Sequence, residues 1–220
     1  MSQVFEYRGV EGLVYAEVLQ DDAEQYQTGE VKHLAPIAEL SKTTQTSNES
    51  HYYDNVPAIV ISSTGADEVT CSLAGIDLEV LADITGQAYD KTTGTMIEGD
   101  RTAKYFALGY KTKKTNGHEV YVWRLKGAFN IPDSTHTTEN DGTDANGQEL
   151  VYTGISTTHI FSKTGKRAKA INVDLEKELA DVTGFFEQVT TPDTVKPILQ
   201  EQSGIVGKGI VGKMTVGRGK

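Results

Sequence analysis

Few residues of this chain have the types and spacing of a catalytic or ligand-binding site. The most familiar motif lies at the end of the sequence. GKGIVG at 207–212 has the G-x-G-x-x-G spacing of a phosphate-binding turn. GKGIVGKM also matches G-x-x-x-x-G-K, but Met214 stands where Ser or Thr is required. Both motifs need a strand before them and a long helix after them, and only six residues follow Met214. The pattern therefore predicts no nucleotide site.

Metal and catalytic patterns also fail on spacing. DGTDANGQE at 141–149 resembles a calcium loop, but its first and twelfth ligand positions fall on Gly142 and Thr153, where acids are needed. The histidines at 33, 51, 118, 136 and 159 have no i, i+4 pair, and there is no H-E-x-x-H or G-x-S-x-G. Cys71 lies in the alternating stretch VTCSLA, which favours a small buried hydrophobe over a nucleophile. We expect no catalytic, cofactor-binding or metal-binding residue and no enzyme activity.

Composition narrows the class of protein. The 220 residues suit one large domain, or one domain with arms. The single cysteine excludes an internal disulfide and a cysteine zinc site, which indicates synthesis in a reducing cytoplasm. No apolar run approaches the roughly 18 residues of a membrane span, and the first twenty residues do not read as a signal peptide. The net charge of −10, with Lys208, Lys213, Arg218 and Lys220 gathered in the tail, predicts an acidic body that repels nucleic acid.

The elements that would position any site are mostly strands. Strand-like stretches occupy 12–19, 37–46, 51–54, 57–62 and 67–74, rich in Thr, Val and Tyr. One helix is predicted over 75–86, with Asp77 as its cap and Gly86 as its end. Leu78, Leu81 and Ala82 share a face of it, so we expect it to lie across the open face of a sheet. Residues 87–102 are predicted to form a loop.

The strongest local pattern is a β-hairpin over 106–129. YVWRLKGAF at 121–129 alternates apolar and charged residues, as in a strand with one wet face. Asn116-Gly117 favours a two-residue turn, which would set Tyr110 opposite Trp123, Leu108 opposite Leu125 and Phe106 opposite Gly127. The apolar side chains of both strands would then share one face, packed on the helix and an opposing sheet. The other face would carry Lys111, Lys113, Arg124 and Lys126, facing outward or meeting acidic partners of other subunits.

The second half of the chain reads as loops around one further hairpin and one short helix. Residues 131–149 form a polar acidic loop, 150–173 a hairpin turning near Thr164-Gly165, and 174–186 a short helix capped by Asp174. GIVGK occurs twice, at 204–208 and 209–213. We predict a main domain over 1–183 and a Gly/Lys-rich extended C-terminal arm over 184–220. The fold class is mainly β (α+β): a β-sandwich or half-barrel with one flanking helix, long loops and that arm.

The order of these elements resembles one family. VTCSLAGIDLEVLADITG is a strand followed by a D-L-x-x-x-x-A-x-x-x-G helix, and HYYDN at 51–55 is similar to an early x-Y-x-D-(D/N) segment. The chain resembles the major tail proteins, or tail tube proteins, of long flexible-tailed bacteriophages of Gram-positive bacteria, over roughly residues 10–175. That family typically reads ALG(F/Y)…NG…YVWLYKG(K/A)F after the helix. Its positions are filled here by Ala107, Leu108, Gly109, Tyr110, Asn116, Gly117, Tyr121, Val122, Trp123, Lys126, Gly127 and Phe129, whereas Arg124 replaces a residue that is often neutral and the GIVGK tail has no counterpart.

The resemblance implies a structural role. Such subunits are β-sandwiches with a flanking helix that form hexameric rings stacked into a tube around a tape-measure protein, and genome DNA later passes through the bore. The implied partners are other copies of the chain, the tape-measure protein, the tail terminator and distal tail or baseplate proteins, with DNA as non-specific cargo and no membrane. The implied location is the virion, after synthesis in the host cytoplasm. Residues 40–56, the 131–149 loop and the C-terminal arm are the candidate contacts between rings.

Two other classes of function stay open. A surface binding module, either carbohydrate-binding or immunoglobulin-like, would need exposed aromatic side chains on a flat face, for which Tyr52, Tyr53 and Tyr105 are candidates. A hydrolase with a dispersed site would bring distant acids and histidines together only in the fold.

Overall fold

The structure is a computed structural model that describes residues 4–136 and 147–198. Most of the described chain is β-structure, and its one α-helix is α1 (Leu78–Thr85). No helix in the described ranges is long and apolar enough to cross a membrane. The strands are β1 (Tyr7–Asp21), β2 (Tyr26–Thr28), β3 (Lys32–His33), β4 (Ile37–Tyr53), β5 (Val56–Leu73), β6 (Ala88–Asp90), β7 (Thr95–Ile97), β8 (Phe106–Lys114), β9 (Glu119–Phe129), β10 (Gln148–Gly154), β11 (Ala170–Asp174), β12 (Ala180–Asp181) and β13 (Lys196–Pro197).

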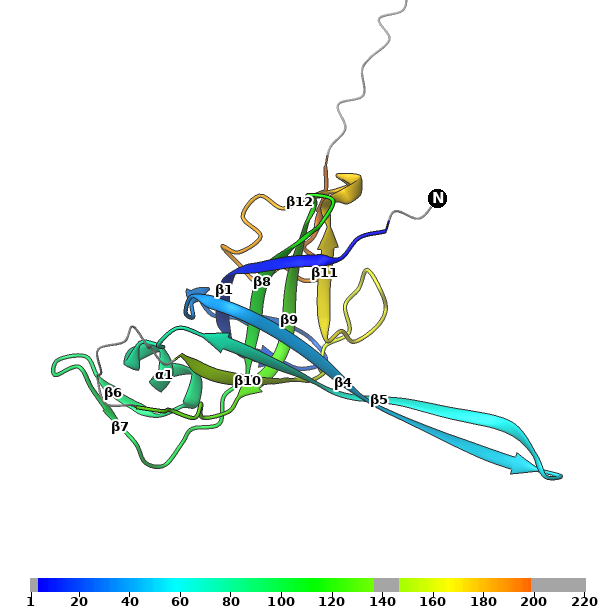
Figure 1. The fold of residues 1–220 in the computed structure, drawn as a ribbon, viewed down its shortest axis with the longest axis horizontal. Coiled ribbons are helices and arrows are strands. Elements are labelled where there is room, and N and C mark those ends of the chain that lie inside the picture. The colour runs from blue at the N-terminus through cyan, green and yellow to red at the C-terminus, as the bar shows by residue number, and fades with distance from the viewer. Residues whose placement is uncertain (1–3, 137–146, 199–220) are drawn as a thin grey trace, which may run out of the picture.

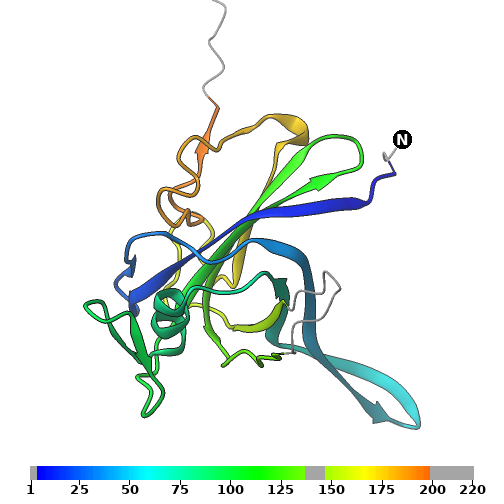
Figure 2. The same ribbon diagram turned by 60° about the vertical axis from the view of Figure 1, so that its left-hand side comes forward.

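Nine of these strands form one curled sheet. Of the two predicted mainly-β folds, the sandwich and the half-barrel, the chain therefore adopts the half-barrel. The strands follow the order β2-β1-β8-β9-β10-β5-β4, with β3 also paired to β1 and β11 also paired to β9. Figure 1 shows the sheet wrapping around the centre of the molecule, and Figure 2 shows the curl from the side. Two small sheets, β6-β7 and β12-β13, lie apart from it.

Both faces of the central strands are buried. One apolar cluster includes Tyr15, Phe106, Leu108, Val122 and Tyr152, and Ile84 of α1 packs into it. A second cluster, drawn from alternate positions of the same strands, includes Val14, Ala107, Trp123 and Leu125 and is covered by Phe161, Phe185 and Val189 from the C-terminal part of the chain. The alternation of side chains across a strand explains how neighbours such as Val122 and Trp123 enter different clusters. The centre of the sheet therefore has no solvent-exposed face.

The central hairpin forms as predicted, but its turn and register differ. The backbone N–H of Lys114 donates to the carbonyl of His118 at 2.8 Å, so three residues, not two, make the turn. A two-residue turn of this kind needs positive φ at both Asn116 and Gly117, and only Gly117 has it, at 91°. Trp123 consequently pairs with Gly109, and Leu108 pairs with Arg124. The predicted pair of Phe106 with Gly127 is confirmed, because a register shift beyond Leu108 restores it.

The one-residue shift explains why the predicted apolar face is wrong. Trp123 lies on the side opposite to Tyr110, where a Cβ at Gly109 would come within 2.9 Å of the indole ring. The indole N–H donates to the carbonyl oxygen of Phe185 at 2.9 Å. The tryptophan is thus fully buried, but beneath the C-terminal segment and not beneath the helix.

Helix α1 is confirmed with its caps. The Asp77 carboxylate accepts from the backbone N–H of Glu79, and Gly86 ends the helix with a φ of 71°. Its buried side chains are Ala82, Ile84 and Thr85, whereas Leu78 is half exposed. Leu81 packs against the first cluster, so the predicted inner face is confirmed at Leu81 and Ala82 and is wrong at Leu78, which lies in the first turn.

Two predictions for the second half of the chain are wrong. The predicted hairpin over 150–173 does not form: β10 and β11 both pair with β9, at different stretches, and only the local turn at Thr164-Gly165 is as expected. The predicted helix over 174–186 is a single 3-10 turn, Leu175–Lys177, capped by Asp174. It ends at Glu178, which has a φ of 49°, and the chain then enters β12.

The first residues of the predicted C-terminal arm pack against the body. Phe185 and Val189 are buried in the second cluster. Residues 199–220, with the GKGIVG motif and the repeated GIVGK, lie outside the described residues, as does the 137–146 part of the acidic loop with most of the calcium-like pattern.

Candidate assembly surface

The most unusual feature of the fold is a hairpin that leaves the body. Strands β4 and β5 pair along their whole length, and their outer part projects well beyond the rest of the molecule (Figures 1 and 2). We call residues 45–65 the arm. No described side chain of the arm is buried, although the strands continue into the sheet at Leu40 and Cys71. Isolated two-stranded hairpins are marginally stable in water, so the arm depends on its root and on what it touches.

The arm carries apolar side chains where solvent would favour polar ones. Ile59, Val60 and Ile61 are 50%, 61% and 53% exposed, and the aromatic Tyr52 and Tyr53 are 65% and 60% exposed. A continuous apolar run of this kind is typical of a strand buried on both faces. Contiguous exposed apolar groups in a soluble protein mark interaction sites. The arm is therefore the first candidate for an assembly surface.

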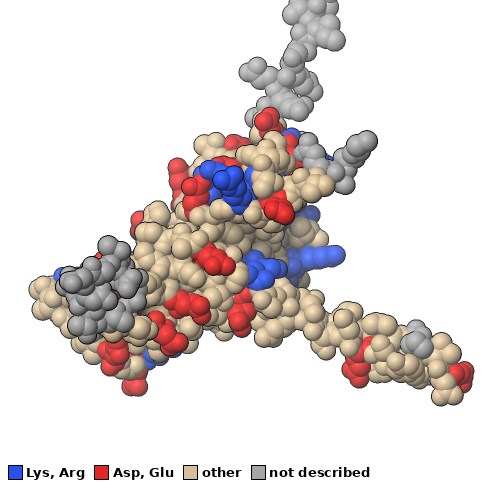
Figure 3. Space-filling model, in the orientation of Figure 1, with Lys and Arg blue, Asp and Glu red and all other residues tan. Residues whose placement is uncertain are grey.

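Charge on the arm is sparse and acidic. Glu49 and Asp54 are its only Asp, Glu, Lys or Arg residues. Figure 3 shows the arm as a mainly uncharged projection with a few acidic groups. At its end, Asp54 and Asn55 form the turn with φ of 50° and 64°. Two consecutive positive φ angles define a tight two-residue hairpin turn, which Asp and Asn tolerate better than other residues with side chains. The tip is therefore narrow.

A buried ion-pair network holds the root of the arm. The Asp67 carboxylate accepts from Thr44 Oγ1 at 3.0 Å, from Arg124 Nη1 at 2.8 Å and from Lys169 Nζ at 3.4 Å. Lys169 also donates to the carbonyl of Gly65, at the base of the arm. Burial opposes ionisation of Asp67, but the Thr44 hydrogen bond and the charges of Lys169 and Arg124 outweigh it and lower the pKa of this carboxyl. The network fixes where the two strands leave the sheet.

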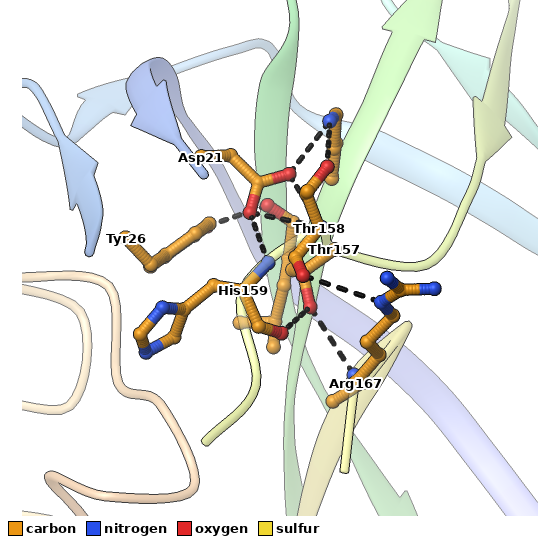
Figure 4. A network of polar contacts seen from close by, with 9 residues as sticks. Asp21, Tyr26, Thr157, Thr158, His159 and Arg167 are labelled. Carbon is orange, nitrogen blue, oxygen red and sulfur yellow. Dashed lines mark hydrogen bonds and ion pairs between the residues drawn. The ribbon is translucent and has the colours of Figure 1, made fainter. Parts of the chain in front are cut away.

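A second buried carboxylate ties the loops on the other side of the sheet. The side chain of Asp21, at the end of β1, is 3% exposed, and its carboxylate accepts from Lys126 Nζ at 2.6 Å. It also accepts from the backbone N–H groups of Thr158 and His159, at 2.8 and 2.9 Å (Figure 4). Burial opposes ionisation here too, but these three donors lower the pKa of Asp21. The network joins the β1–β2 turn to the segment between β10 and β11.

The predicted basic face of the central hairpin does not exist, because its four cations point to different places. Lys111 and Lys113 share Glu11 and Glu119, at 3.1 to 3.5 Å. Arg124 is buried against Asp67 on the other side of the sheet, and Lys126 is bound to Asp21. The acidic partners that we expected from other subunits are found within the chain.

The other predicted candidates are scattered. Tyr52 and Tyr53 lie at the arm tip, whereas Tyr105 lies in the body, 4.9 Å below the ammonium of Lys126. The three tyrosines do not form one flat platform. Cys71 is buried as expected. Within the described ranges, no group of three or more His, Cys, Asp or Glu residues is placed to hold a metal ion.

Sequence reasoning missed the two buried carboxylates and the full extent of the arm. The arm had a readable signal, since Ile59-Val60-Ile61 and Tyr52-Tyr53 flank a possible Asp-Asn turn. Arg124, a lone cation between Trp123 and Leu125, was a weaker signal for a buried pair. Asp21 and Asp67 had none, because the cations that bind them come from segments more than 50 residues away.

Comparison with known proteins adds no constraint: no protein-family model matches the chain, and no curated protein matches it.

Proposed function

We propose that the protein is a structural, non-catalytic subunit of a bacteriophage tail tube, which assembles into stacked hexameric rings that conduct genome DNA during ejection. The arm is the observation that carries this proposal. It projects from the body and exposes six large hydrophobic side chains, which are Tyr52, Tyr53, Val56, Ile59, Val60 and Ile61. The resemblance of the helix and central hairpin to tail tube proteins gives the kind of assembly.

The open edges of the curled sheet suit lateral contacts. In the described sheet order, β2 and β4 stand at the two ends. Edge strands have unpaired backbone N–H and C=O groups that can pair with another chain. In a ring of subunits, the neighbouring subunits can supply these partners. On this proposal the arm makes contacts between rings, because it extends far beyond the sheet. The acidic composition suits a conduit, since like charge keeps DNA from binding its wall.

The proposed partners follow from this role. They are other copies of the chain, a tape-measure protein inside the tube, and tail terminator and distal tail or baseplate proteins at its ends. DNA is a non-specific cargo of the bore. The protein is made in the host bacterial cytoplasm and ends in the virion.

Electron microscopy of the concentrated protein tests the proposal. We expect rings or tubes for the parent, and loss of stacking for the triple variant Ile59→Ser, Val60→Ser, Ile61→Ser. Burying three half-exposed aliphatic side chains is worth about 3 kcal/mol, so the association constant should fall about a hundredfold. The matched control is Leu78→Ser with Ile97→Ser, two exposed apolar residues of the body. A parent that stays monomeric at high concentration, or an arm variant that assembles like the control, would overturn the proposal.

A carbohydrate-binding surface module is the alternative, and the exposed Tyr52 and Tyr53 favour it. Aromatic rings at a protein surface stack on sugar faces, but two adjacent tyrosines on a narrow tip offer little flat area. A glycan array separates the two functions: specific glycan binding lost in Tyr52→Ser would support the alternative, and no binding would support assembly.

A further inference from the structure

A cavity of about 580 Å³ opens between β1 and β4, two strands that the sheet order places far apart. One wall is apolar and consists of Val10, Leu40, Tyr110, Val120 and Val122. Its rim carries Ala38, Glu39 and Lys42 of β4, all exposed. The cavity therefore lies in the half-barrel beside the root of the arm, since Asp67 also lines it.

The cavity contains a guanidinium with unused hydrogen-bonding capacity. Arg124 is 5% exposed and lines the cavity. Its Nη1 binds Asp67, its Nη2 lies 3.5 Å from the Tyr110 hydroxyl, and its Nε has no hydrogen-bond partner among the described residues. A guanidinium has five N–H donors, and leaving buried donors unpaired is costly. Because Lys169 also binds Asp67, two cations face one anion there. The Nε–H of Arg124 is therefore a buried donor that lacks an acceptor among the described residues, beside a carboxylate that two cations share.

The arm tip has the complementary chemistry. Tyr52 and Tyr53 are exposed rings, and the adjacent Asp54 offers a carboxylate at the turn. The tight turn makes this end of the arm narrow enough to enter a cavity. Glu49 and Asp54 are its only charged groups, so nothing on the tip repels Arg124.

The tip cannot occupy the cavity of its own chain. The root of the arm is the pair Thr44–Asp67, beside the cavity, and its tip is at the pair Tyr53–Val56. About nine residues at roughly 3.3 Å each carry the tip about 30 Å away. Figures 1 and 2 show the arm running outward from the body. A tip that enters this cavity therefore has to come from a second copy of the chain.

We propose that the cavity between β1 and β4 of one copy receives the arm tip of another, with Tyr52 and Tyr53 against its apolar wall and Asp54 directed towards Arg124. This rests on the proposed function and names the receptor for the arm. The two surfaces are different, so the contact is head to tail, and each copy gives one tip and accepts one. Head-to-tail contacts close into rings or propagate as open filaments. Repeated tip-to-root docking gives the long axis of a tube.

Cross-linking tests the contact directly. Two variants, Tyr53→Cys and Ala38→Cys, are purified separately, mixed and oxidised, with the buried Cys71 left in place. We expect a disulfide-linked dimer on a non-reducing gel that forms in the mixture and not when either variant is oxidised alone. The matched control replaces Ala38→Cys by Ser41→Cys, an exposed β4 residue that does not line the cavity. The cross-link should be at least tenfold weaker with Ser41→Cys, and equal yields from the two positions would overturn the proposal.

Assembly measurements separate this proposal from the proposed function. Ala38→Glu narrows the rim and adds negative charge, so stacking should be lost, whereas Ser41→Glu should assemble like the parent. Asp54→Asn should weaken association about tenfold, the worth of one charge-assisted hydrogen bond. Tubes that persist in Ala38→Glu, with no cross-link, would refute the cavity as receptor and leave the tail-tube role standing. A parent that never assembles would refute both.

Discussion

Replacing Asp67 by Asn removes the anion that neutralises a buried guanidinium at the root of the arm. The side chains of Asp67 and Arg124 are 8% and 6% exposed, and their charged atoms are 2.8 Å apart. Removing one partner of a buried ion pair costs about 3–5 kcal/mol, because the other charge stays buried and unpaired. Lys169 loses the same partner. We expect Asp67→Asn to cost about 3 kcal/mol, a large part of the 5–15 kcal/mol that stabilises a typical domain.

Urea unfolding followed by the fluorescence of Trp123 measures this cost, since the only tryptophan is fully buried. Glu68→Gln is the matched control: the neighbouring residue of β5 is exposed, so its change should stay within about 0.5 kcal/mol. The double variant Asp67→Leu, Arg124→Met removes both charges together. It should be much less destabilised than Asp67→Asn, because replacing a whole buried pair by apolar groups is often neutral.

The stability that Asp67 contributes depends on pH with a definite sign. The pKa of Asp67 is lowered in the folded state, so its stabilisation is present above the unfolded pKa of about 3.9 and is lost as pH falls through the folded pKa. The difference between the parent and Asp67→Asn should therefore be full at pH 7 and shrink below pH 4. A cost under 0.5 kcal/mol at pH 7, or a cost that persists unchanged in acid, would refute the reasoning.

Three further predictions concern the body. Gly109→Ala should lower the free energy of urea unfolding by about 1–3 kcal/mol, because its Cβ would lie 2.8 Å from Val14 and 2.9 Å from Trp123. The control Gly75→Ala has open space around it and should be near neutral. Equal effects of the two changes would contradict the packing at Gly109. Asp21→Asn should lower the free energy of unfolding by about 2 kcal/mol at pH 7 and by progressively less below pH 4, since the pKa of Asp21 is lowered in the folded state. The control is Glu24→Gln at an exposed position. A cost equal to that of the control would refute the role of the Asp21 network. Burial raises the pKa of the Cys71 thiol to about 12, so a thiol reagent at pH 8 should modify it only on unfolding; rapid modification of the native protein would show that β5 opens.

Local signals in the sequence were sufficient for several elements. Asp77 and Gly86 set both ends of α1, because a cap acts on the backbone within one turn of itself. Asn116-Gly117 marked the central hairpin, and Asp174 capped a turn where expected, although that turn did not grow into a helix. The mainly-β class followed from strand patterns along the chain. In each of these elements, the deciding contacts join residues that are close in sequence.

The register of the central hairpin shows where local signals stop. A two-residue turn was plausible from the dipeptide alone. In the fold, the backbone N–H of Thr115 donates to the carbonyl of Glu6, and Trp123 lies across the bare backbone of Gly109. These contacts favour a register one residue away from the expected one. Because side chains alternate between faces, one step moved Trp123 away from the side of Tyr110.

The sequence by itself determined that this chain forms β-strands around one capped helix, with acidic composition and no recognisable catalytic motif. Only the tertiary structure decided that the central sheet is buried on both faces and that Arg124 and Lys126 are neutralised by Asp67 and Asp21. It also decided that the apolar side chains of the arm are left in solvent. The physical reason is the distance along the chain over which each effect acts. Propensity, caps and turns act over a few residues, whereas burial and charge pairing depend on which distant strands the curl of the sheet brings together.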